Sequence, residues 1–183
     1  MLGSPDTARK GNGISAMGML VAIVAALLDQ GIVQYEYILG GMVVGGAVGA
    51  VAARTVAMTS MPEMVALFNG VGGAASGLVG LSALSLDGSS FTYITIILSI
   101  LIGGVTFTGS LIAYGKLSET IGSGALTFAG QKFVNGLIVL GIVTSAVMFV
   151  MNPADTNMLY AVVGLSLLFG IMVVIPIGGA DMP

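Results

Sequence analysis

Six apolar stretches follow one another along the chain, separated by polar or turn-forming residues. They cover roughly residues 14–28, 37–53, 62–84, 92–117, 133–151 and 158–177. Most approach the roughly 20 residues that an α-helix needs to cross the hydrocarbon core of a bilayer. None alternates apolar and polar residues as a transmembrane β-strand would. The pattern predicts an all-α fold, a polytopic transmembrane helix bundle of six spans that forms a single transmembrane domain over residues 1–183.

Composition supports the membrane assignment and removes several kinds of chemistry. Only 7% of the residues are charged, whereas 56% are hydrophobic; a soluble domain usually carries about 25% charged residues. The chain has no cysteine and no histidine, so thiolate and imidazole metal ligands are missing and we expect no metal site. A net charge of −3 argues against nucleic-acid binding.

The charged residues also predict how the spans are oriented. If the six spans alternate in direction, one set of loops and ends carries every base of the chain, namely Arg9, Lys10, Arg54, Lys116 and Lys132. The other set carries only acids: Asp29, Glu36, Asp87 and Asp155. The positive-inside rule then places both chain ends in the cytoplasm. We therefore expect a multi-pass protein of the inner or plasma membrane.

Glycines at four-residue spacing indicate close helix packing. Gly41, Gly45 and Gly49 form one such row, and Gly73 and Gly77 form another. Small residues let transmembrane helices approach closely, because lipid gives apolar side chains no drive to associate. We therefore interpret both rows as packing seams.

Two glycine patterns resemble nucleotide loops without meeting their requirements. Gly70–Ala75 has the GxGxxA spelling of a dinucleotide site, but it lies inside an apolar run with no strand before it. The segment 109-GSLIAYGK-116 has five residues between its glycines where a P-loop has four, and Leu117 stands where Ser or Thr is required. We expect this chain to bind no nucleotide cofactor.

The third span begins with a capping signal and carries an amide at depth. Ser60 and Glu63 have the spacing of a capping box, and Pro62 fits the first turn of a helix. Asn69 then lies about 13 Å along the helix axis and is the amide that we place well inside a span. It either bonds to a neighbouring helix or lines a water-filled path, where it can both donate and accept.

Two further groups of polar residues carry alternative interpretations. Thr106, Thr108 and Ser110 lie close together on the fourth span. Their hydroxyls either bond to carbonyls one turn earlier or line the same hydrated cavity as Asn69. Near the C-terminus, Asp181 follows two glycines; it is either a solvated loop acid or a functional group at the cytoplasmic mouth.

Three segments together resemble a known family over most of the chain. They are 58-MTSMPEMVALFN-69, 104-GVTFTGSLIAYGKL-117 and 175-IPIGGADMP-183, and the chain resembles the membrane domain of the β subunit of proton-translocating NAD(P) transhydrogenase. The resemblance implies an enzyme component that conducts protons, while separate soluble domains bind NAD(H) and NADP(H) and transfer hydride from NADH to NADP⁺. No hydride-transfer centre is expected on this chain. The implied partners are the lipid bilayer, α-subunit membrane helices, both soluble domains and a second αβ unit in a dimer.

The resemblance also implies roles for individual residues. Asn69 matches a position where many members have a histidine implicated in proton transfer, so the titratable group must come from elsewhere, for example an α-subunit helix. Thr106, Thr108 and Ser110 are expected on the same proton path, and Asp181 is expected to couple that path to the NADP(H) domain. The family's functional asparagine after the GGADMP motif has no counterpart before the chain ends at Pro183, which indicates a fragment.

Two other functions remain as alternatives at this stage. A secondary transporter of a small solute would have internal repeats and broken helices around a midplane site, and no convincing repeat relates the two halves. A passive membrane anchor would tolerate apolar replacement of Asn69 together with the three hydroxyl residues of the fourth span.

Overall fold

The computed structural model describes residues 5–28, 35–84 and 88–182. Within these ranges the secondary structure is helical, with no strand. The helices are α1 Pro5–Leu27, α2 Tyr35–Thr55, η1 Met58–Ser60, α3 Met61–Ser82, α4 Ser90–Leu117, α5 Gln131–Met151, α6 Thr156–Val174 and η2 Gly179–Asp181. Six of them are long and apolar enough to cross a membrane, which confirms the all-α prediction of six spans. Asp29 and Asp87, used to predict orientation, lie outside the described residues.

Helix ends follow local chemistry, and some differ from the predicted bounds. α1 begins at Pro5, well before the predicted start at 14. α6 ends at Val174 and not near 177, because Pro176 lacks the N–H that would extend the helix. α5 begins after Gly130, whose φ of 86° lies in the left-handed region that glycine adopts without strain.

The chain divides into two compact units, Met1–Thr55 and Val56–Pro183. That the two form a single domain stays a prediction. The first unit holds α1 and α2, where the Tyr35 hydroxyl donates to the carbonyl of Leu27 at 3.1 Å. No described residue of α2 is buried.

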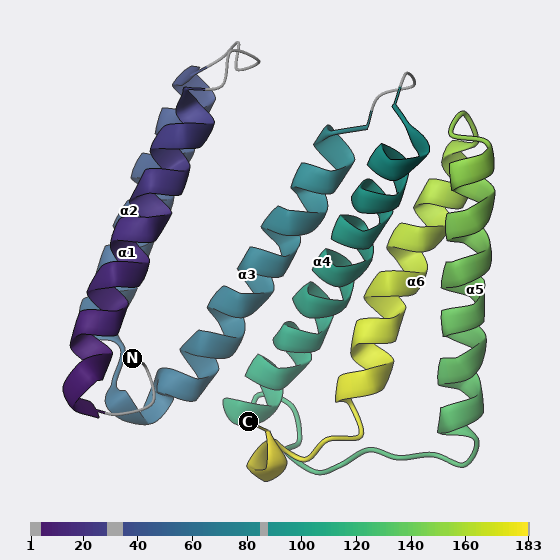
Figure 1. Cartoon of the computed structure of the whole chain (residues 1–183). Coiled ribbons are helices and arrows are strands. Elements are labelled where there is room, and N and C mark those ends of the chain that lie inside the picture. Colours follow the sequence, from purple (N-terminus) through teal and green to yellow (C-terminus); the bar gives the residue numbers. More distant parts are fainter. Residues whose placement is uncertain (1–4, 29–34, 85–87, 183) are drawn as a thin grey trace. The chain divides into compact units, whose positions relative to one another are not determined.

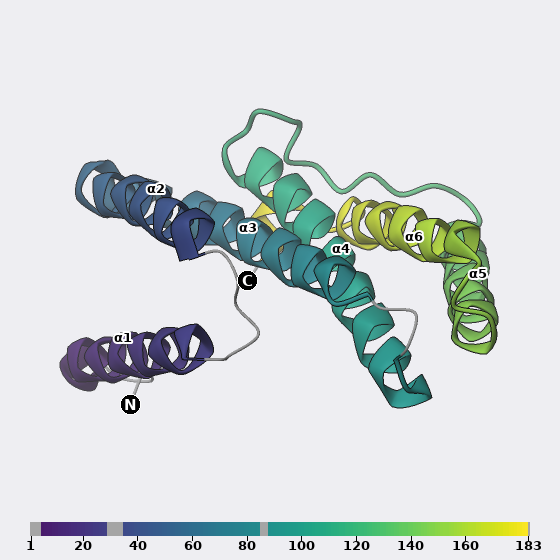
Figure 2. The same cartoon turned by 90° about the horizontal axis from the view of Figure 1, so that it is seen from above.

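The second unit is an open row of four helices. α4 packs against α3 on one side and α6 on the other, and α5 packs against α6; Figure 2 shows this order from above. Consecutive helices run antiparallel, so α4 and α6 run in the same direction (Figure 1). The apolar core lies where α4, α5 and α6 meet, and it comprises Tyr93, Ile96, Ile97, Ile100, Phe149, Leu159 and Val162.

The contact between α3 and α4 is a backbone contact made by glycines. A Cβ added to Gly103 would lie 2.5 Å from the amide nitrogen of Gly77 and 2.6 Å from the carbonyl oxygen of Gly73. A Cβ added to Gly73 would lie 2.7 Å from the Cβ of Thr106. The packing seam predicted for Gly73 and Gly77 is therefore confirmed. We call Gly73, Gly77 and Gly103 the glycine seam.

Candidate functional site

Asn69 and Ser110 form a polar pair between α3 and α4. The Nδ2 of Asn69 donates to the Oγ of Ser110 at 2.9 Å. Ser110 is buried, whereas Asn69 is exposed on the surface of this chain. The neighbouring Gly70 makes this approach possible, because a Cβ there would already lie 3.1 Å from the Cβ of Ser110. The structure thus joins two predicted site residues that are 41 positions apart in the sequence.

A cavity of about 620 Å³ extends from this pair toward one end of the unit. Its walls come from α3, α4, the end of α6 and the residues after α6, reaching Met61, Leu117 and Met182. Asn69 and Ser110 are its polar side chains, and none of the described residues that line it is titratable. The cavity therefore connects the amide to the end of the unit where α3 begins, through mostly apolar walls.

The two threonines lie in helix contacts on either side of α4, and neither lines this cavity. Thr106 packs against Gly73 of α3. The hydroxyl of Thr108 is placed to donate to the carbonyl of Gly104 at 3.1 Å and to that of Leu167 on α6 at 2.7 Å. The first of these is the bond to the preceding turn that the sequence suggested, and the second ties α4 to α6.

Asp181 lies outside the apolar part of the unit. It ends the short helix η2 and is exposed, and its N–H donates to the carbonyl of Gly178 at 3.0 Å. The next residue, Met182, lines the cavity. Asp181 is therefore the sequence neighbour of a residue that lines the cavity leading to Asn69.

The predicted capping box does not form as a hydrogen-bonded pair. Ser60 occupies the N-cap position of α3 and Glu63 lies in its first turn, but the Ser60 side chain makes no capping hydrogen bond. In a capping box, the Glu63 carboxylate would accept a hydrogen bond from the N–H of Ser60. Here that N–H donates instead to the carbonyl of Ala57 at 3.0 Å. The helix η1 thus satisfies this group in place of the box.

Two buried polar groups were missed by sequence reasoning. Lys116, assigned to a loop by its charge, is 1% exposed and donates to three backbone carbonyls. Asn135 lies near the start of the predicted span 133–151, and its buried Oδ1 has no hydrogen-bond partner among the described residues. Lys116 differs from the other four bases in lying inside a predicted apolar run, 92–117, and that position is the signal that could have singled it out.

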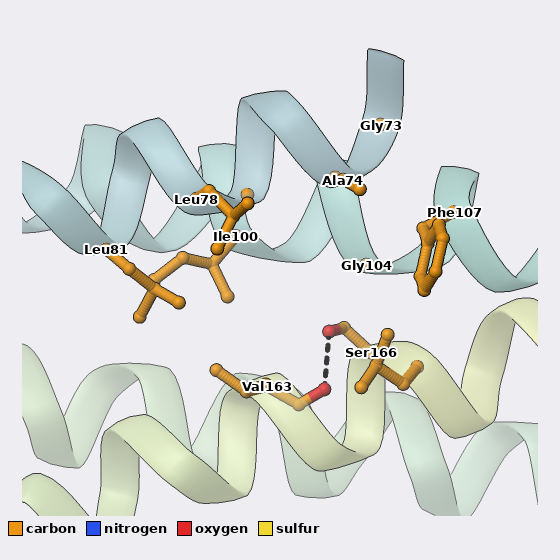
Figure 3. Close-up of a pocket in the computed structure, with 12 residues that line it drawn as sticks. Gly73, Ala74, Leu78, Leu81, Ile100, Gly104, Phe107, Val163 and Ser166 are labelled. Carbon is orange, nitrogen blue, oxygen red and sulfur yellow. Dashed lines mark hydrogen bonds between the residues drawn. The ribbon is translucent and has the colours of Figure 1, made fainter. Parts of the chain in front are cut away.

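A second hollow, of about 280 Å³, lies between α3, α4 and α6. Figure 3 shows its lining, in which Leu78, Ile100 and Phe107 surround the space with glycines. Its buried polar side chain, Ser166, donates to the carbonyl of Val163 on its own helix at 2.8 Å. Among the described residues that line it, the hollow therefore offers a polar solute no free side-chain hydrogen-bond donor.

Comparison with known proteins gives one consistent result. The family model of the NAD(P) transhydrogenase beta subunit matches residues 1–183. The chain is 34% identical over 193 residues to NAD(P) transhydrogenase subunit beta of Rhodospirillum rubrum, and equally to the subunit of a designated strain of that species. Each alignment covers 100% of this chain and 41% of the relative, so the chain spans less than half the length of these curated relatives.

Proposed function

Because the chain belongs to the NAD(P) transhydrogenase beta subunit family, we propose that it is the proton-conducting membrane part of a transhydrogenase. Proton movement through it is coupled to hydride transfer from NADH to NADP⁺. That transfer takes place in separate soluble domains, which bind NAD(H) and NADP(H). This chain binds neither nucleotide and supplies the path through the membrane.

The observation that carries this proposal is the polar pair at the inner end of the cavity. Asn69 lies eight residues after Met61, or about 12 Å along the helix, and the cavity reaches both residues. Water entering at the end of the unit can therefore reach an amide that both donates and accepts hydrogen bonds. Asn69 orients this water, and its bond to Ser110 fixes the amide.

The exposure of Asn69 supports a titratable group supplied by a partner helix. A polar amide that faces lipid is costly, so in the assembled enzyme another membrane helix covers it. We assign that helix to the α subunit, with a titratable side chain, such as a histidine, facing Asn69. Neither an amide nor a hydroxyl holds a transferable proton at ordinary pH, and the cavity lining adds no titratable group.

The direction of the path follows from charge. Arg54 lies in the last turn of α2 and Lys132 in the first turn of α5, as expected if all bases lie on the cytoplasmic side of the inner or plasma membrane. Both described chain ends then face the cytoplasm. Asp181, at the same end of its unit as the cavity mouth, couples proton movement to the NADP(H) domain, and two αβ units form the dimer.

The test is Asn69→Leu in the reconstituted full enzyme, compared with Asn157→Leu. Asn157 is an exposed amide in the first turn of α6, at the opposite end of the second unit, so the control makes the same chemical change away from the cavity. We expect Asn69→Leu to lower proton-coupled turnover by about tenfold or more. Hydride exchange confined to the soluble domains should stay at the wild-type rate, and Asn157→Leu should change neither.

Two results would contradict the proposal. Normal coupled turnover in Asn69→Leu would remove Asn69 from the path. Equal losses in Asn69→Leu and Asn157→Leu would mean that the enzyme responds to any change in its helices. A passive anchor would tolerate Asn69→Leu combined with Ser110→Ala without loss of coupling.

A further inference from the structure

The end of α4 carries a buried cation held by main-chain oxygens. The Nζ of Lys116 donates to the carbonyls of Gly124 at 3.0 Å, Ile175 at 2.5 Å and Ile177 at 2.7 Å. An ammonium group has three N–H donors, so all three are used. None of the described carboxylates makes an ion pair with Lys116, which is 1% exposed.

The position of these carbonyls explains how the buried charge is stabilised. Ile175 directly follows α6 and Ile177 lies two residues further on, so both are near the helix C-terminus, where the dipole places partial negative charge. The carbonyl of Gly124 comes from the loop 118–130, which joins α4 to α5. One side chain thus connects the end of α4, the loop and the residues after α6.

Backbone hydrogen bonds extend this connection toward Asp181. The N–H of Leu126 donates to the carbonyl of Ile175 at 3.2 Å, and the N–H of Gly179 donates to the carbonyl of Ser123 at 2.8 Å. Figure 1 shows the loop 118–130 and the C-terminal segment at the end of the unit where α3 begins. We call Lys116, the loop 118–130 and residues 175–181 the C-terminal latch.

We propose that Lys116 is a positioning residue for coupling. It holds the segment 175–181 against the end of α4, so that Asp181 stands at the mouth of the cavity. The inference rests on the proposed coupling role of Asp181. Lys116 itself carries no proton along the path, because its three N–H groups bind main-chain oxygens and it does not line the cavity.

The chain offers a direct probe of the latch, because it contains no cysteine. A Cβ on Gly179 would lie 3.3 Å from the Cβ of Ser123, within a few tenths of an ångström of the about 3.5–4.5 Å spanned in a disulfide. Ser123→Cys combined with Gly179→Cys in the full enzyme should therefore cross-link rapidly on mild oxidation. Each single variant serves as the control for intramolecular bonding.

Adding Lys116→Met to the cysteine pair should slow cross-linking by at least about tenfold, because hydrogen bonds to a charged group are lost. Lys132→Met is the matched control, since Lys132 is an exposed base at the same end of the unit. It should cross-link at the unaltered rate. Equal rates in the two lysine variants would overturn the latch.

Coupled turnover then tests the positioning role. In the reduced cysteine pair, Lys116→Met should lower coupled turnover by about tenfold or more, as expected when the bonds to the segment are lost, while exchange in the soluble domains stays unchanged. Oxidation should restore coupling to within about twofold of the oxidised pair with Lys116 present, because the disulfide closes the same contact. A general loss of fold would not be repaired by one cross-link.

Failure of this inference differs from failure of the proposed function. If Lys116→Met slows cross-linking but leaves coupled turnover normal, or if the cross-link forms without restoring turnover, Lys116 does not position a coupling group. The effect of Asn69→Leu is independent of either result. If Lys116→Met does not fold, deuterium exchange in the unaltered enzyme decides: the amides of Leu126 and Gly179 should exchange at least about tenfold more slowly than that of Gly124, and equal exchange would overturn the latch.

Discussion

α2 and α3 both carry glycines at four-residue spacing, but the two rows have different surroundings. On α3, Gly73 and Gly77 meet Gly103 of α4 at backbone distance. On α2, a Cβ added to Gly41, Gly45 or Gly49 would meet no described atom of its own unit within 4 Å. Glycine spacing therefore marks a helix face that another helix can approach closely. Whether close packing occurs depends on a partner helix that also presents small residues, as α4 does with Gly103.

The largest expected effect comes from filling the seam on one helix and the open row on the other. Gly103→Ala should destabilise the protein by about 2–3 kcal/mol or more, because its methyl group would strike main-chain atoms of Gly73 and Gly77 that cannot rotate away. Gly45→Ala should be neutral or stabilise by up to about 1 kcal/mol, since alanine favours helix more than glycine does. Thermal unfolding of the full enzyme in detergent measures both, and equal effects would erase the distinction between the rows.

A smaller effect on stability is expected to distinguish hydrogen bonds that join two helices from hydrogen bonds within one helix. Thr108→Val removes the bond to Leu167 on α6 and should cost about 1 kcal/mol. Thr144→Val is the matched control, because the Thr144 hydroxyl bonds to the carbonyl of Leu140 in its own helix at 2.8 Å. It should change the free energy of unfolding by less than about 0.5 kcal/mol. A larger loss in the control would show that helix-internal bonds stabilise these helices as much as ties between them.

The smallest effect lies at the exposed edge of the α3–α4 contact. The hydroxyl of Ser99 donates to the carbonyl of Ser76 on α3 at 2.8 Å, and Ser99→Ala should cost about 0.5 kcal/mol. Thr55→Val on α2 removes only a bond to Val51 of the same helix and should have no measurable effect. If Thr55→Val cost more stability than Ser99→Ala, the hydrogen bond within α2 would contribute more than the hydrogen bond between α3 and α4.

The helices could be predicted because each depends on its own residues. A long apolar run must form internal hydrogen bonds in lipid, so Phe133 to Met151 and its counterparts indicate helices without knowledge of their neighbours. The ends were less predictable where a second element intervenes. At Ser60, for example, the helix η1 uses the N–H that a capping box would bind.

The candidate site was predictable only in part, because it depends on distant residues. Asn69 could be identified as a polar residue at depth, but its partner Ser110 depends on the register that Gly70 allows. Thr106 and Thr108 shared the pattern of Ser110, but Thr106 packs against Gly73 of α3 and Thr108 bonds to Leu167 of α6. Lys116 was counted as a loop charge, because its neighbours in the sequence do not indicate that the carbonyls of Ile175 and Ile177 lie beside it.

The cavity beside Asn69 has a consequence for proton leakage across the membrane. Its described lining supplies an amide and a hydroxyl but no titratable group. In the proposed scheme, a chain inserted before its partner therefore cannot short-circuit the membrane potential during biogenesis. In that scheme the proton path is completed only when the enzyme assembles, so proton flow through the path begins only in the assembled enzyme.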